Sequence, residues 1–185
     1  MKKELREKYL KLRDSLSDEE RRIKSELIMT SVLLLPEIAS ANSISCYFSF
    51  GSEVDTKQLI ELLLLIGKRV SVPYCDFAKQ EMQMVEIKSL QDISVNSKIP
   101  QPKGTSVVPK EALDVIIVPG ICFDLRGYRV GFGNGFYDSY LENVSATKIG
   151  LAFEEQIIER LPAELHDERV DIIVTDKRII FTHKK

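Results

Sequence analysis

Short runs of β-branched and aromatic residues alternate with helical patterns along the whole chain. The runs that predict strands are 43–48, 69–73, 82–87, 114–118, 147–152, 171–174 and 179–182. The segments that predict helices are 5–16, 17–35, 55–67, 134–141 and 153–160. Strands that alternate with helices bury their apolar faces in a layered α/β sheet. The pattern therefore predicts an α/β fold, in which the nearly continuous apolar run 114–118 is a buried strand.

The composition is that of a globular chain with one core. The chain has 185 residues, of which 44% are hydrophobic and 29% are charged. A chain of this length buries about 70% of its unfolded surface, which excludes a disordered chain and fits one domain. The formal net charge of −2 makes nucleic acid a poor first partner, because polyanion binders usually carry a basic domain or stripe.

Three further features bear on location. Cys46, Cys75 and Cys122 are far apart and form no CxxC motif, which favours reduced thiols over a zinc site or a disulfide. The first residues are charged with no apolar stretch behind them, unlike a secretory signal. The densest apolar segment, 59–66, is too short to span a bilayer. We therefore expect a cytoplasmic protein that binds neither nucleic acid nor membrane.

The first helix combines an apolar stripe with a basic face. Its apolar residues recur at helical spacing, namely Leu5, Tyr9, Leu12 and Leu16. Its other positions hold six basic residues against two acidic ones, a local charge of +4 from Lys2, Lys3, Arg6, Lys8, Lys11 and Arg13 against Glu4 and Glu7. Such a face is usually solvated, but a helix that starts with basic residues can also dock on a polyphosphate.

The second helix has clear start and stop signals. Ser17 and Glu20 have the spacing of a capping box, and Pro36 ends the helical pattern. We expect Ile23, Leu27 and Leu34 to form its apolar face.

The most informative stretch is PGICFDLRGYRVGFGNGFYD, residues 119–138. It follows a buried strand and precedes a helix, and ligands of open α/β sheets bind at the carboxyl ends of strands. Gly131, Gly133 and Gly135 let backbone amides approach an anion closely, and the next helix adds its positive dipole end. The loop therefore suits phosphate. It matches neither the Walker nor the dinucleotide spacing, however, and a tight structural turn explains it about equally well.

Charged residues near this loop support the phosphate hypothesis. Arg129 offers a planar, permanently charged fork for phosphate oxygens. Asp138 lies in the first turn of the expected helix, where it either ligates magnesium or only complements the helix dipole. Asp171 opens a strand and is either a surface acid or a second metal ligand.

Aromatic residues and another carboxylate suggest a second ligand. Phe132, Phe136 and Tyr137 either pack in the core or line a flat heteroaromatic ligand. Glu53 follows the strand 43–48, in the segment FSFGSE. A carboxylate there can accept hydrogen bonds from the amino and ring nitrogens of a pterin-like ring, or it is an ordinary acid ahead of a helix.

Four segments together resemble the 5-formyltetrahydrofolate cyclo-ligase family, also called 5,10-methenyltetrahydrofolate synthetases. They are KKELR at the start, FSFGSEVD around Glu53, the highly specific pattern over 119–138, and LPAELHD followed by Val170-Asp171. The resemblance implies a single three-layer α/β/α domain over residues 1–185, with a central, largely parallel or mixed sheet. It also implies a ligase that uses ATP and Mg²⁺ to convert 5-formyltetrahydrofolate to 5,10-methenyltetrahydrofolate, ADP and phosphate, through a phosphorylated formyl group.

The resemblance also implies a role for each matching residue. Lys2, Lys3 and Arg6 would contact ATP, and its phosphates would be held by Arg129, Gly131, Gly133, Asn134 and Gly135. The folate would be lined by Phe48, Glu53, Phe132, Phe136 and Tyr137. Arg129 and Tyr137 would also serve catalysis, and Asp138 and Asp171 match positions assigned to magnesium. The expected partner is a folate with or without a polyglutamate tail, and the expected state is a monomer or weak dimer.

Three positions depart from the family pattern. Many relatives have lysine or arginine where this chain has Phe132 and Asn134, and the usual Tyr-Tyr pair is Phe136-Tyr137 here. The changes remove basic charge and one hydroxyl from the phosphate side. Two alternatives therefore stay open: a folate-binding protein without ligase chemistry, and another ATP-dependent enzyme that acts on a different formyl or amide substrate.

Overall fold

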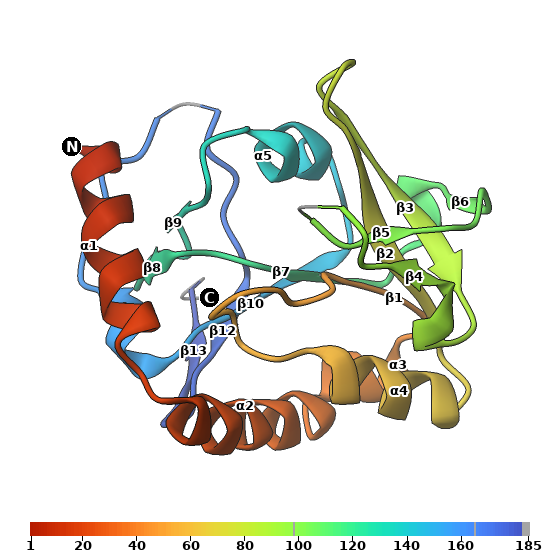
Figure 1. The fold of residues 1–185 in the computed structure, drawn as a ribbon, viewed down its shortest axis with the longest axis horizontal. Helices are drawn as coiled ribbons and strands as arrows, with labels where there is room; N and C mark the ends of the chain where they lie inside the picture. Colours follow the sequence, from red (N-terminus) through yellow and green to blue (C-terminus); the bar gives the residue numbers. More distant parts are fainter. Residues whose placement is uncertain (98, 165, 183–185) are drawn as a thin grey trace.

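An eight-stranded mixed sheet forms the centre of the molecule (Figure 1). The computed structural model describes residues 1–97, 99–164 and 166–182. The strands lie in the order β13-β12-β10-β7-β1-β2-β3-β6, and the five from β12 to β2 are parallel. In chain order they are β1 (Ser43–Cys46), β2 (Arg69–Asp76), β3 (Glu81–Ile87), β6 (Val107–Val108), β7 (Val115–Val118), β10 (Thr147–Leu151), β12 (Ile172–Val174) and β13 (Ile179–Phe181).

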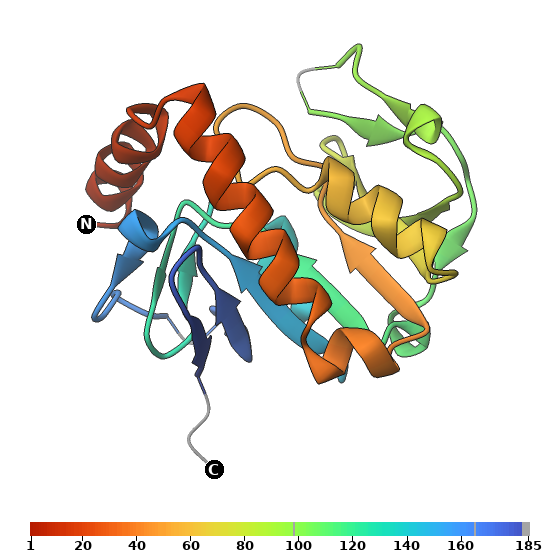
Figure 2. The same cartoon turned by 90° about the horizontal axis from the view of Figure 1, so that it is seen from below.

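Helices cover both faces of this sheet, which confirms the predicted α/β layering (Figures 1 and 2). The helices are α1 (Lys2–Asp14), α2 (Asp18–Leu33), α3 (Pro36–Ser40), α4 (Lys57–Leu65) and α5 (Phe136–Leu141). Successive residues of a strand point to opposite faces. Ile117 of β7 therefore joins the core beneath α2, α3 and α4, whereas Ile116 joins the core that contains Phe136 and Leu141 of α5.

A smaller sheet and helix α1 pack together beside the main sheet. The small sheet has the order β11-β8-β9 and consists of β8 (Cys122–Asp124), β9 (Arg129–Val130) and β11 (Ile157–Ile158). Helix α1 contacts β8 and β9, and Tyr9 packs with Cys122 and Val130 in a third apolar cluster. This packing places the basic helix next to β9, from which the glycine loop continues.

The rest of the structure consists of short elements at the edges. A separate pair of strands is formed by β4 (Ile93–Ser94) and β5 (Gln101–Pro102). Single 3₁₀ turns are η1 (Leu90–Asp92), η2 (Lys110–Ala112) and η3 (Glu154–Gln156). None of the helices in the described part of the chain combines the length and the apolar character that a membrane crossing needs.

The predicted helix over 153–160 is wrong. The chain makes only the turn η3 there and then extends into β11, which pairs with β8. The buried Gln156 side chain explains the change, because its amide donates to the carbonyl oxygens of Gly120 and Ile121 at 3.1 and 2.8 Å. These long-range hydrogen bonds and the strand pairing outweigh the local helical propensity.

The predicted faces of the first two helices also need correction. In α2 the buried residues are Ser25, Ile28 and Val32, whereas Ile23, Leu27 and Leu34 are all at least 45% exposed. The sequence offers apolar residues on both sides of this helix, and the sheet takes only one side. In α1 the buried residues are Tyr9 and Arg13, while Leu12 is 38% exposed.

Candidate active site

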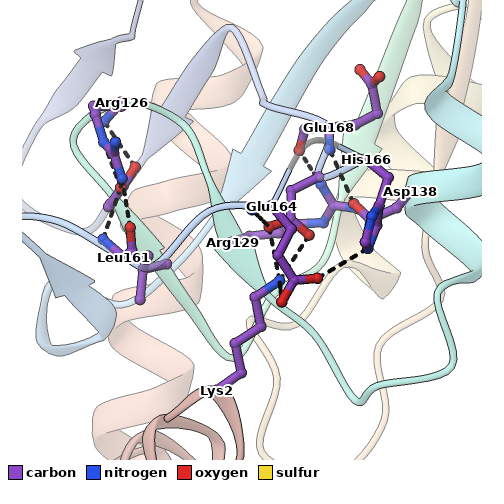
Figure 3. Close-up of polar contacts among 10 residues, drawn as sticks. Lys2, Arg126, Arg129, Asp138, Leu161, Glu164, His166 and Glu168 are labelled. Carbon is purple, nitrogen blue, oxygen red and sulfur yellow. Dashed lines mark hydrogen bonds and ion pairs between the residues drawn. The ribbon is translucent and has the colours of Figure 1, made fainter.

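The buried carboxylate of Asp124 fixes the turn that leads to the glycine loop. Asp124 is fully buried between β8 and β9. Its Oδ1 accepts the backbone N–H groups of Arg126 and Tyr128 at 3.0 Å, and its Oδ2 accepts the N–H of Leu161 at 2.9 Å. The Arg126 guanidinium adds an ion pair to the same carboxylate at 2.7 Å (Figure 3). Asp124 therefore determines where β9 begins, and with it where Arg129 lies.

Arg129 is a buried cation at the start of this loop. Its Nη2 donates to Oδ1 of Asp138 at 2.8 Å, and its Nη1 donates to the carbonyl oxygen of Glu168 at 2.7 Å. The guanidinium also lies 5.9 Å from the ring centroid of Tyr137. Figure 3 shows Arg129 and Asp138 side by side, below the segment that carries Glu168. The predicted phosphate ligand and the predicted magnesium ligand are thus in direct contact.

Two glycines of the loop have backbone conformations that other residues rarely adopt. Gly133 has φ of +101°, and a Cβ there would lie 3.1 Å from Nη2 of Arg6. Gly135 has φ of +71° and is the N-cap of α5. Arg6 in turn donates from Nε to the carbonyl oxygen of Gly131 at 2.7 Å. The glycines therefore allow an arginine of α1 to lie directly on the loop.

Helix α1 and the glycine loop enclose a polar pocket of about 520 Å³. The residues that line it are Lys2, Arg6, Arg129, Val130, Gly131, Gly133, Gly135, Asp138, Ser139, Glu142, Glu164, His166 and Glu168. Three of them are permanent or strong cations, and they converge from two separate parts of the chain. The same lining holds four carboxylates, those of Asp138, Glu142, Glu164 and Glu168, so the pocket offers charges of both signs to a ligand.

Acidic residues of the 164–168 segment already engage one of these cations. Nζ of Lys2 lies 2.8 Å from Oδ2 of Asp167 and 3.3 Å from Oε1 of Glu164 (Figure 3). Burial lowers the pKa of Lys2, but its hydrogen bonds and charge interactions with Asp167 and Glu164 together outweigh burial and leave this pKa raised. Burial likewise raises the pKa of Asp167, but its hydrogen bonds to Lys2 and to the N–H of Glu164, together with the nearby positive charge, leave it lowered. Both groups are therefore held in their charged forms.

A second region adjoins the same loop through Phe132, which is 46% exposed, and contains the buried Glu53. We call Phe50, Glu53, Phe132 and Tyr137 the aromatic site. The rings of Phe50 and Phe132 stack with centroids 5.8 Å apart. The backbone N–H of Phe50 donates to Oε2 of Glu53 at 3.1 Å. The Tyr137 hydroxyl is buried and has no hydrogen-bond partner among the described residues, so it is available to a ligand.

Glu53 has an unusual environment for a carboxylate. It is 8% exposed, and burial raises its pKa to about 7, although the Phe50 N–H and the positive charge of Arg13 oppose that rise. The tyrosine hydroxyls of Tyr47 and Tyr137 interact electrostatically with it. Close to neutral pH this group can therefore either accept or donate a hydrogen bond.

Most of the predicted site residues meet in these two regions, but several do not. Lys3, Asn134 and Asp171 are absent from the described residues that line the polar pocket. The carboxylate of Asp171 accepts the backbone N–H of Lys148 at 2.8 Å, which gives it a structural role at β10. Phe136 is buried in the core with the edge of Phe77 against its ring, and Phe48 packs on the opposite core beneath Lys57.

Sequence reasoning missed two groups of residues. Arg13 is expected on a basic face that is either solvated or docked on a polyphosphate, yet it is buried, and its spacing of four residues from the buried Tyr9 is the available signal. The segment with Glu164 and His166 is part of the family pattern LPAELHD, and Glu168 lies just beyond that pattern. Nothing in the local sequence shows that it crosses over to Lys2 and Arg129, because that contact depends on the tertiary fold.

Fold and site together define an α/β protein with a polar pocket and a neighbouring aromatic site. The pattern of the 5-formyltetrahydrofolate cyclo-ligase family matches residues 1–176. The chain is 32% identical to the 5-formyltetrahydrofolate cyclo-ligase of Escherichia coli K12, over 90% of this chain and 96% of that one. It is 34% identical to the mouse (Mus musculus) protein of the same name, over 86% of each.

Solved structures agree with the sequence relatives. The structure of Aquifex aeolicus 5,10-methenyltetrahydrofolate synthetase superposes with a TM-score of 0.88 and 36% identity, over 100% of this chain and 94% of that one. The synthetase of Mycoplasma pneumoniae gives a TM-score of 0.77 at 25% identity, over 95% and 98% of the two chains. This chain belongs to the 5-formyltetrahydrofolate cyclo-ligase family, and the enzyme class predicted from its motifs is confirmed.

Proposed function

We propose that this protein uses ATP and Mg²⁺ to convert 5-formyltetrahydrofolate to 5,10-methenyltetrahydrofolate, with release of ADP and phosphate. The observation that carries the proposal is that one loop borders both regions of the site. Gly131 and Gly133 line the polar pocket, whereas Phe132 between them stacks on Phe50 in the aromatic site. A polyphosphate in the pocket and a flat ring beside Glu53 would meet across this loop.

The reaction needs such a meeting because the oxygen of an amide carbonyl is a poor leaving group. When the formyl oxygen attacks the γ-phosphorus, a phosphorus–oxygen bond forms there, the bond to the β-phosphate oxygen breaks, and ADP leaves. The arylamine nitrogen of the folate then attacks the formyl carbon and loses its proton. Phosphate departs with the former formyl oxygen as the ring closes. The protein's contribution to such a reaction is mainly positioning and charge stabilisation.

The cations of the polar pocket are assigned to the nucleotide. Lys2 and Arg6 approach from α1 and Arg129 from β9, so they can contact different phosphates. Arg129 also serves catalysis in this proposal, because a buried guanidinium beside the transferred group stabilises its charge. The family resemblance adds Lys3, Asn134 and the amides of the glycine loop to the nucleotide contacts.

The aromatic site is assigned to the folate. Glu53 can accept hydrogen bonds from ring and amino nitrogens, and the unpartnered hydroxyl of Tyr137 can bond to the substrate. Phe132 supplies an apolar surface, and Phe48 and Phe136 would support the region from the two cores. In this proposal Tyr137 contacts the reacting formyl group, since its buried hydroxyl has no partner among the described residues and its ring lies 5.9 Å from the Arg129 guanidinium.

The residues of the polar pocket also fit magnesium. Mg²⁺ usually takes one or two protein carboxylates and completes its shell with water and phosphate oxygens. Asp138 lines the pocket, and its hydrogen bonds to Arg129 and to the N–H of Glu168 engage only Oδ1, which leaves Oδ2 for an ion. Bound magnesium would offset the negative charge of the phosphates. Asp171 enters this assignment only through the family resemblance.

We infer the cellular setting from the whole chain. Its three cysteines are free thiols, which suits the reducing cytoplasm. Its net charge of −2 does not suit a polyanion partner. We propose that residues 1–185 act as one domain, as a monomer or weak dimer, on folates with or without a polyglutamate tail.

The test compares the complete reaction mixture with mixtures that each lack one component. Purified protein, 5-formyltetrahydrofolate, ATP and Mg²⁺ are mixed, and the near-ultraviolet absorbance of the methenyl product is followed. We expect an increase that requires all four components. If a folded protein binds the folate but forms no product, the proposal fails in favour of a folate-binding protein, which the uncharged Phe132 and Asn134 would then explain.

A further inference from the structure

Arg13 is a buried cation that the nucleotide pocket does not use. It lies in the last turn of α1 and is only 3% exposed. A buried charge is costly unless it is well paired. The Nε of Arg13 donates to Oγ of Ser52 at 3.0 Å, and Ser52 also hydrogen-bonds to Asp14. The end of α1 is thereby tied to the loop that carries Glu53.

Arg13 touches both loops that form the aromatic site. On one side it holds Ser52, whose neighbour Glu53 accepts the N–H of Phe50. On the other side its guanidinium carbon lies 6.0 Å from the ring centroid of Phe132, which belongs to the glycine loop. Phe50 and Phe132 stack on each other, so Arg13 closes a ring of contacts between the two loops. Removal of the Arg13 side chain would take away its contacts with both loops.

The charge of Arg13 acts on Glu53 as well. Burial raises the pKa of Glu53, and the Phe50 N–H and the Arg13 cation lower it again. The hydroxyls of Tyr47, which follows β1, and of Tyr137 in α5 interact electrostatically with the same carboxylate. Glu53 also borders a small cavity of about 220 Å³, whose charged lining residues are Asp18, Arg21, Arg22, Asp55 and Lys57. Among these groups, Arg13 is the cation that lowers the pKa of Glu53.

We propose that Arg13 is a positioning residue that holds Glu53 and Phe132 in the arrangement that receives the folate and keeps Glu53 available as a hydrogen-bond acceptor. This inference rests on the proposed function, since it takes the aromatic site as the folate site. It assigns Arg13 no contact with ATP. The same helix would therefore serve the nucleotide at its start, through Lys2 and Arg6, and the folate at its end.

Steady-state kinetics of Arg13→Met and Arg13→Lys separate this role from a general structural one. For Arg13→Met we expect the KM for the folate to rise about tenfold, while the KM for ATP changes less than about twofold. The acidic limb of kcat/KM for the folate should move up by about one pH unit, because loss of a nearby cation raises the pKa of a carboxyl group. Arg13→Lys keeps the charge and should leave that limb in place.

Two further variants make the result specific. Ser52→Ala removes the hydrogen-bond acceptor but keeps the cation, so the KM for the folate should rise without movement of the acidic limb. Lys11→Met removes an exposed charge from the same helix and should behave like the wild type. Thermal unfolding of each variant shows whether it is folded. If Arg13→Met does not fold, Arg13→Lys and Ser52→Ala still decide the outcome.

A titration of the ligand-free protein tests the charge effect without turnover. The side-chain carboxyl of Glu53, labelled with carbon-13 and assigned with Glu53→Gln, should titrate at higher pH in Arg13→Met than in the wild type. An unchanged titration together with an unchanged folate KM overturns the inference, as does an equal rise in both KM values. A wild type that forms no methenyl product overturns the proposed function instead, and the titration then decides the role of Arg13 alone.

Discussion

The polar pocket and the aromatic site share the glycine loop but differ in how their charged groups are buried. In the pocket, Lys2 is 27% exposed and pairs with Glu164, which is 56% exposed, and with Asp167, which is 10% exposed. In the aromatic site, Glu53 is 8% exposed, and the adjoining Arg13 is 3% exposed. Arg6 and Arg13 lie only seven residues apart on α1, about 10 Å along its axis. The comparison teaches that position, rather than residue type or burial, decides which arginine lines the pocket and which one ties down a loop, because the buried Arg129 also lines the pocket.

The largest expected effect concerns the buried carboxylate. Because burial raises the pKa of Glu53 from 4.5 to about 7, the folded protein binds this proton more tightly than the unfolded chain does. The contribution to stability is fully present below pH 4.5 and is lost as the pH rises through about 7. The loss amounts to about 3 kcal/mol. Glu53→Gln cannot ionise, so its free energy of unfolding should gain about 3 kcal/mol relative to the wild type between pH 4 and pH 8.

Urea unfolding of both proteins across this pH range measures the difference. Glu61→Gln, on an exposed position of α4, is the matched control and should show no such trend. If the difference in free energy of unfolding between Glu53→Gln and the wild type does not change with pH, Glu53 is as well solvated as the groups of the polar pocket. The contrast between the two regions would then break down.

The next effect tests the buried cation of the pocket. Arg129→Met keeps the bulk but removes the fork that contacts Asp138 and the Glu168 carbonyl. We expect kcat/KM for ATP to fall at least about 100-fold, or about 2.7 kcal/mol. The matched control is Arg160→Met, which removes an exposed guanidinium. Normal kinetics in a folded Arg129→Met protein would remove Arg129 from the nucleotide site.

How far the sequence determines these two regions differs as well. The strands of the main sheet other than β6, the α/β layering and the glycine loop could be predicted, because periodicity and glycine spacing are local signals. The strands of the small sheet were not predicted. The pocket residues Arg129 and Asp138 lie in one continuous motif, so the sequence indicates that they lie close together. The roles of Arg13 and Gln156 were not, because each is set by partners that lie more than 30 residues away in the chain.

A substitution within the glycine loop gives an effect of intermediate size. Gly133→Ala places a Cβ at φ of +101° and 3.1 Å from Nη2 of Arg6. We expect a loss of about 1 kcal/mol in stability and a several-fold rise in the KM for ATP, because Arg6 must shift. In Gly104→Ala the new Cβ would meet only ordinary contacts, at 3.8 Å and beyond. Equal behaviour of the two variants would argue that Arg6 does not depend on the loop conformation.

The smallest expected effect concerns the ion pair of Lys2 and Asp167, whose side chains are 27% and 10% exposed. Asp167→Asn keeps an oxygen for Lys2 and for the N–H of Glu164 but removes the charge that competes with an anion. ATP should then bind about two- to threefold more tightly at low salt, since an ion pair that solvent still reaches contributes about 1 kcal/mol at most. The gain should vanish near 1 M salt, where the Debye length is about 3 Å.

Equilibrium titration with ATP at several salt concentrations measures this effect. Asp76→Asn removes a charge of the same kind from the β2–β3 hairpin, away from the pocket, and should leave ATP affinity unchanged. If Asp167→Asn instead weakens ATP binding at every salt concentration, Asp167 itself belongs to the nucleotide site. A carboxylate that only competes with ATP would lose its effect at high salt. A loss of affinity that persists there would therefore mean that the acidic segment contributes a ligand to the pocket.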